Sequence, residues 1–215
     1  MNVEKTLYSN FKSYSHFTNK NNQNGKNDSK KSTSQFIKPL IGSAIGVSAG
    51  ILAYKKMPKT KFKTANEVSE MLLMAGGANV GGVLGGSIGK TKKQKDKKWK
   101  EAGFQLMNIS IPMLMVSGVL ETCKHVKKLN NNACKIVGSF AGMIAGAATA
   151  TAITNATREE NEPYRKYSIK DSVSNVDDII ATLKIGFNDI LKYIPVDKIL
   201  PFIYIYTGIR SGSKE

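Results

Sequence analysis

Cysteine and histidine side chains are the first candidates for chemistry in this sequence. Cys123, His125 and Cys134 offer three possible zinc ligands within a short stretch. Their spacing matches no standard zinc site, a fourth ligand is missing, and the nearby lysines would oppose a bound cation. Two cysteines are also too few to imply a disulfide framework. We therefore predict no metal site in this stretch.

A glycine-rich stretch and a methionine pair are the other candidates. GGSIGKT, which ends at Thr91, resembles the end of a phosphate-binding loop. The first glycine of that motif would fall at Leu84, and no strand pattern precedes it. Met113 and Met115 carry sulfur that suits copper(I), although adaptable packing is the usual role of methionine. Because no serine, cysteine or histidine lies in a recognisable nucleophile motif, we predict no enzyme, no catalytic residue and no cofactor.

Two amide side chains lie in apolar surroundings. Asn79 falls within an uncharged stretch, and Asn108 stands one helical turn before Pro112. An amide that is buried without hydrogen-bond partners is costly, so each of them needs partners. They can join neighbouring helices through hydrogen bonds, or they can line a polar path beside a helix that is kinked at Pro112.

The elements that position these residues are rich in glycine at every fourth position. In water, each glycine inside a helix costs about 0.5–1 kcal/mol relative to alanine. In a bilayer the backbone satisfies its own hydrogen bonds, and a face without side chains lets a second helix approach closely. The predicted helix-packing residues are Gly42, Gly46, Gly50, Gly77, Gly81, Gly85, Gly89, Gly138, Gly142 and Gly146.

Four apolar segments carry the glycine ladders and the two amides. We expect membrane-spanning helices over residues 36–54, 65–89, 103–120 and 133–153. Thr64 and Glu67 have the spacing of a capping box at the start of the second helix. The fold class that follows is an all-α polytopic membrane bundle of about four glycine-zipper helices, with C-terminal amphipathic helices. The predicted organisation is a disordered polar tail (1–35), a transmembrane bundle (36–155) and a C-terminal region (156–215).

The C-terminal region contains an amphipathic pattern. Apolar residues over 176–194 fall on one helical stripe, and the opposite, polar face includes Lys184. We expect this helix to lie on a surface instead of crossing the membrane. Asp197 is expected to cap a shorter element over 199–206, which Pro201 interrupts and which is too short to cross a bilayer as a helix.

The formal net charge of +16 comes mainly from lysine clusters between the apolar segments. Single-strand nucleic-acid binding needs aromatic residues among the basic ones, and these clusters hold one tryptophan, so we predict no nucleic-acid partner. Anionic lipid headgroups are the predicted partners of the lysines. Counted with Lys38 and Lys135, which lie at the N-terminal ends of the first and fourth spans, the tail and the second loop carry seven basic residues each, against five and four in the first and third loops. The positive-inside rule then places both termini in the cytoplasm, and we expect the plasma membrane.

These patterns favour an integral membrane protein without enzymatic activity. The leading hypothesis is an assembly or scaffold component that packs through its glycine faces, as a homo-oligomer or with a membrane-protein partner. The alternative is a small transporter or pore with a polar path near Asn79, Asn108 and Pro112. Four glycine-rich spans resemble the mitochondrial inner-membrane translocase proteins. The arginine-and-aspartate signature of that family is absent, so no function follows from the resemblance.

Overall fold

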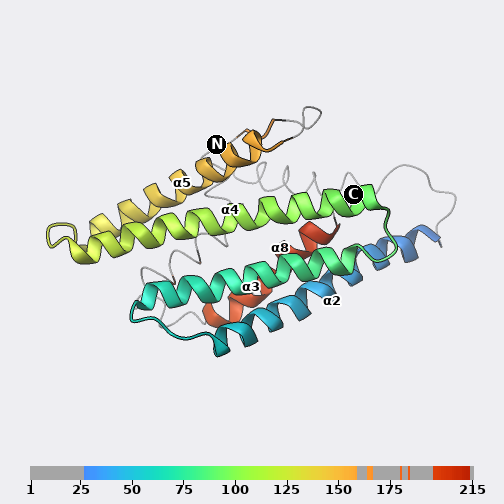
Figure 1. Ribbon diagram of the computed structural model, residues 1–215, viewed down its shortest axis with the longest axis horizontal. Coiled ribbons are helices and arrows are strands. Elements are labelled where there is room, and N and C mark those ends of the chain that lie inside the picture. Colours follow the sequence, from blue (N-terminus) through green and yellow to red (C-terminus); the bar gives the residue numbers. More distant parts are fainter. Residues whose placement is uncertain (1–26, 159–163, 167–179, 181–183, 185–195, 214–215) are drawn as a thin grey trace, which may run out of the picture. The chain divides into compact units, whose positions relative to one another are not determined.

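Helices are the elements of regular structure throughout the described residues of this computed structural model (Figure 1). The structure describes residues 27–158, 164–166, 180, 184 and 196–213. The helices in that part of the chain are α2 (Asn27–Lys56), α3 (Lys63–Gly86), α4 (Lys92–His125), α5 (Asn132–Ala156) and α8 (Val196–Ser213). The prediction of an all-α protein is confirmed.

Four of these helices are long and apolar enough to cross a membrane. They are Gln35–Lys56 of α2, then α3, α4 and α5 over their full lengths. Their number and apolar character fit an integral membrane protein, as the sequence predicted. The chain divides into two units after Ser34, and the packing described below is that of the second unit, which begins at Gln35.

The start of α3 differs from the prediction. No side chain caps the helix, because the N-cap residue is Phe62, so the predicted capping box of Thr64 and Glu67 is wrong. Thr64 is buried instead, and its hydroxyl accepts a hydrogen bond of 2.6 Å from the Nζ atom of Lys124 in α4. A tertiary partner has therefore replaced the local cap.

The end of α3 also differs from the prediction. The helix ends at Gly86, so the expectation that it continues to Gly89 is wrong. Gly89 has φ +77°, a left-handed conformation that glycine adopts without strain, and a Cβ atom there would meet nothing within 4 Å. Gly89 therefore belongs to the turn into α4. A capping box does occur there, between Thr91 and Gln94 at the start of α4.

Helices α2 to α5 run alternately up and down. Gly42 of α2 lies against Gly81 of α3 and Gly50 lies against Leu73, so α2 and α3 are antiparallel. The contact of Thr64 with Lys124 makes α3 and α4 antiparallel as well. Helix α5 returns along α4, whereas α8 runs parallel to α3 (Figure 1). Their shared core includes Met71, Met74, Val116, Leu120 and Tyr204.

The C-terminal predictions need two corrections. Helix α8 runs without a break through Pro201 and is longer than the element expected over 199–206. Asp197 lies in its first turn and pairs with Lys184, which is buried and not on a solvated polar face. Contacts with α3 stabilise α8 as one helix, which its local sequence alone would not do. The rest of the amphipathic stripe over 176–194 lies outside the described residues, apart from Ile180.

The polar tail needs one further correction. Helix α2 begins at Asn27, inside the segment that we expected to be disordered up to residue 35. Residues 1–26 lie outside the described part of the chain.

Candidate functional site

The first packing surface of α3 faces α2. Gly77, Gly81 and Gly85 lie on this surface, and a Cβ atom on any of them would overlap a backbone carbonyl oxygen of α2. The reverse also holds, because a Cβ atom on Gly42 or Gly46 would overlap a carbonyl oxygen of α3. The two backbones are thus in direct contact over successive turns, which only glycine allows.

The second packing surface of α3 faces α8, and sequence reasoning missed it. A Cβ atom on Gly82 would overlap the carbonyl oxygen of Gly208, and one on Gly86 would overlap that of Gly212. These positions follow the first surface by one residue, which turns them about 100° around the helix axis. The four-residue spacing of Gly208 and Gly212 was the available signal. Helix α3 therefore carries two glycine surfaces, which we call the α2 seam (Gly77, Gly81 and Gly85) and the α8 seam (Gly82 and Gly86).

Asn79 lies at the α8 seam, where both polar atoms of its amide make a hydrogen bond. Its side chain is 1% exposed. Its Oδ1 atom accepts a hydrogen bond of 2.5 Å from the hydroxyl of Ser211, and its Nδ2 atom donates one of 2.9 Å to the carbonyl of Ala75. This geometry joins two helices in the way that buried amides in membrane helices commonly do.

Asn108 and Pro112 lie elsewhere, on α4. Pro112 is buried, and a Cβ atom on Gly146 of α5 would overlap its Cα atom. Asn108 is half-buried, and among the described residues its side chain makes no hydrogen bond. The structure therefore places Asn79 toward α8 and Pro112 toward α5, so these two residues do not share one surface.

The contact of α4 with α5 widens toward the loop that joins them. At Gly146 the nearest atoms are backbone atoms of Pro112, whereas a Cβ atom on Gly142 would lie 3.2 Å from the backbone nitrogen of Val116. At Gly138 the only atom within 4 Å belongs to the side chain of Val119. The two helices therefore diverge along successive turns of α5.

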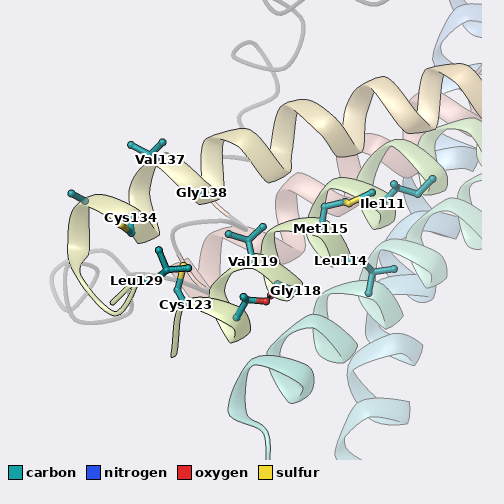
Figure 2. A pocket seen from close by; sticks show the side chains of 12 residues that line it. Ile111, Leu114, Met115, Gly118, Val119, Cys123, Leu129, Cys134, Val137 and Gly138 are labelled. Atoms are coloured by element: carbon teal, nitrogen blue, oxygen red, sulfur yellow. Dashed lines mark hydrogen bonds between the residues drawn. The ribbon is translucent and has the colours of Figure 1, made fainter. Parts of the chain in front are cut away.

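An apolar groove occupies the space that this divergence opens (Figure 2). Its volume is about 1010 Å³. Figure 2 shows Met115, Val119 and Cys123 of α4 on one side, with Cys134 and Val137 of α5 on the other. We call this space the α4–α5 groove.

A charged cluster lies near the start of α3. The Nζ atom of Lys184 is 2.9 Å from a carboxylate oxygen of Glu70 and 2.8 Å from one of Asp197. Burial of Lys184 disfavours its charge, but the hydrogen bonds to Asp197 and Glu70 outweigh that cost, so its pKa is raised above 10.5. The cluster ties the chain at Lys184 to both α3 and α8.

A second charged cluster lies near the start of α4. Arg165 contacts a carboxylate oxygen of Glu101 at 3.3 Å, and its guanidinium lies 3.6 Å from the ring centre of Phe104. Asn155 holds the backbone of Arg165 through two hydrogen bonds. Nearby, Lys98 is buried and donates a hydrogen bond of 2.6 Å to the carbonyl of Gly212, which satisfies the end of α8.

The residues considered for metal chemistry are placed as follows. Cys123 is buried and Cys134 is half-buried, and both are free thiols. The imidazole of His125 lies 3.0 Å from the carbonyl oxygen of Glu121. Within the described residues, no three histidine, cysteine or acidic side chains gather in a group that could hold a metal ion.

Comparison of this chain with protein-family models, with curated proteins and with solved structures found no match. The function is therefore inferred from the helices and their contacts alone.

Proposed function

We propose that this chain is a non-enzymatic assembly or scaffold component of a membrane, as a homo-oligomer or with a membrane-protein partner. The structure supports this proposal in two ways. The α2 and α8 seams are both filled by helices of the chain itself, and the amide of Asn79 is paired inside the bundle. A bundle whose buried amide is satisfied internally suits a structural role better than a role in conducting solutes.

The observation that carries the proposal is the outer face of α5. Its glycines face α4, yet Ala141, Ala145 and Ala152 remain exposed, with Thr149 half-buried among them. Small residues at four-residue spacing let a further helix approach closely in a membrane. We infer that this face, defined by Ala141, Ala145 and Ala152, receives the helix of a second copy or of another membrane protein.

Substitution of this face tests the proposal. We expect Ala141→Leu with Ala145→Leu to reduce the mass of the detergent-solubilised assembly, measured by light scattering, while the helical content stays unchanged. The same change at Ala49 and Ala53 on α2, an exposed pair of alanines at the same spacing, shows whether the contact is confined to the α5 face. The scaffold proposal fails if the parent protein is a monomer and if no partner is recovered with it after cross-linking in native membranes.

The orientation in the membrane is also a proposal. We propose the plasma membrane with both termini in the cytoplasm, on the basis of the lysine distribution. Single cysteines at Lys59, between α2 and α3, and at Lys95, in the first turn of α4, test it with an impermeant label. Labelling of position 95 from outside, with position 59 protected, would reverse the orientation.

A further inference from the structure

We propose that the α4–α5 groove binds one acyl chain of an anionic phospholipid, whose headgroup lies against the lysines of the loop between the two helices and of the first turn of α5. The proposal does not depend on the scaffold function, because a lipid can occupy this groove in a scaffold or in a pore. It depends on the groove itself and on the charges at its end, which lie at the outer leaflet in the orientation proposed above.

The groove has the extent of one leaflet of a bilayer. Its lining on α4 runs from Ile111 to Cys123, which corresponds to roughly 18 Å of helix. Half of a hydrocarbon core of about 30 Å is about 15 Å. Ile111 lies near the middle of the apolar part of α4, and Cys123 lies near its end. The groove thus extends from the interface to the middle of the membrane.

The lining of the groove matches a hydrocarbon chain. Leu114, Met115 and Val137 line it and remain exposed, so the groove is open along its length. Gly118 also lines it, and a Cβ atom there would meet nothing within 4 Å. The volume of about 1010 Å³ is at the upper end of the range of small-molecule sites, which is roughly 300–1,000 Å³.

The charge at the interfacial end of the groove specifies the headgroup. Glu121 is paired with Lys124 and lies 3.9 Å from His125. Lys127, Lys128 and Lys135 make no ion pair with any residue in the part of the chain that the structure describes. Basic residues beside a cleft between membrane helices suit an anionic lipid headgroup. A zwitterionic lipid would leave this positive charge uncompensated.

The experiment measures which lipid the full-length chain retains. Nanodiscs with equal amounts of dioleoyl phosphatidylglycerol and dioleoyl phosphatidylcholine are prepared, and native mass spectrometry counts the lipids that stay bound. We expect phosphatidylglycerol to be retained about tenfold more than phosphatidylcholine. Equal retention of the two lipids by the parent protein would overturn the proposal.

Two pairs of variants separate the headgroup from the acyl chain. The triple change Lys127→Gln, Lys128→Gln, Lys135→Gln should abolish the preference, whereas Lys92→Gln, Lys93→Gln, Lys95→Gln in the second lysine cluster should not. Gly118→Leu, which fills the groove, should lower retention of both lipids. Gly103→Leu is its control, because Gly103 lies on α4 outside the groove and its Cβ position is also empty. An equal loss from both lysine triples would mean general attraction to the membrane surface and would refute the site.

Alkylation of Cys134 gives a second measurement that needs no variant. This half-buried thiol lines the groove, so a bound acyl chain should slow its reaction with a maleimide. We expect slower alkylation in phosphatidylglycerol than in phosphatidylcholine at constant protein concentration. If the alkylation rate of Cys134 depends on the protein concentration and not on the lipid, a second copy covers the groove. The lipid proposal would then fail.

Discussion

Among the helix pairs that use glycine at four-residue spacing, α2 with α3 and α4 with α5 differ in their contacts. In the α2 seam both helices contribute glycine, so Gly42, Gly46 and their partners Gly81 and Gly77 keep the two backbones in contact over successive turns. Between α4 and α5 only α5 contributes glycine. The side chain of Val119 opposes Gly138, and the helices diverge into a groove.

This difference shows what the glycine spacing does and does not determine. A ladder on one helix permits close approach, but a matching ladder on the other helix is needed to maintain it. Helix α3 meets this condition on two faces, and the α2 seam and the α8 seam hold three helices together around it. Because the lipid tails are themselves apolar, such close packing supplies stability that burial alone does not provide in a bilayer.

The largest expected effect is disruption of the α2 seam. Gly81→Leu should destabilise the bundle by about 3 kcal/mol, because the new side chain would meet the backbone of α2, which cannot give way. Gly76→Leu on the same helix is the control, since its Cβ position is empty. Thermal unfolding in detergent measures both variants. If the two variants melt at the same temperature, the close backbone contact is not what stabilises α3.

The destabilisation caused by Gly→Ala changes should decrease along α5 toward the loop that joins it to α4. Gly146→Ala should destabilise by about 1–3 kcal/mol, because the added methyl group would overlap the backbone of Pro112. Gly138→Ala should have a smaller effect, since it meets only the Val119 side chain at 2.6 Å, and that side chain can move. Unfolding midpoints of the two variants give the order. The reverse order would contradict the divergence of α4 and α5.

The charged cluster at the start of α3 gives a pH dependence. The folded-state pKa of Lys184 lies above the ordinary value of 10.5, so its contribution to stability is fully present below pH 10.5. That contribution is lost as the pH rises through the raised pKa. Lys184→Met should cost about 1–2 kcal/mol at pH 8 and flatten the alkaline decline in stability.

The exposed Lys198 gives the control for this pH dependence through Lys198→Met. The free energy of unfolding of Lys184→Met is measured at a series of pH values. If it declines at alkaline pH as it does in the parent protein, Lys184 is not the cause of the decline.

The smallest expected effect concerns the amide at the α8 seam. Asn79→Ala should cost about 0.6–1.7 kcal/mol, in the range measured for hydrogen bonds between membrane helices. Ser211→Ala should be coupled to it in a double-mutant cycle, because the two side chains are hydrogen-bonded. Asn108→Ala should show no coupling with Asn79→Ala. The pore would instead be favoured if the parent protein shows solute flux in proteoliposomes and Asn108→Ala abolishes that flux.

The four spans could be predicted from sequence because their signals are local. Each has an uncharged apolar core with basic residues near its ends, and those features depend on neighbouring residues alone. The α2 seam was equally visible as glycine spacing in 42–50 and 77–85. The exact helix ends were less predictable, because Thr64 pairs with Lys124 instead of capping its own helix.

The α8 seam could not be inferred with the same ease. Asp197, Pro201 and Arg210 give α8 the composition of a short surface element, and its partners on α3 are distant in the sequence. Lys184 was misplaced for a similar reason. The amphipathic pattern identifies a polar side, but it does not show that Glu70 and Asp197 will cover that side. Tertiary contacts decided both cases.

Cross-linking across the α8 seam tests most directly the claim that α3 organises the bundle through two surfaces. In a background without Cys123 and Cys134, cysteines replace Asn79 and Ser211, and an oxidant is added to native membranes. We predict rapid formation of an intramolecular disulfide, because the two side chains are in contact. A pair at Asn79 and the exposed Lys198 should not cross-link. Failure of the first pair to cross-link, in a protein that is folded and membrane-embedded, would contradict the account.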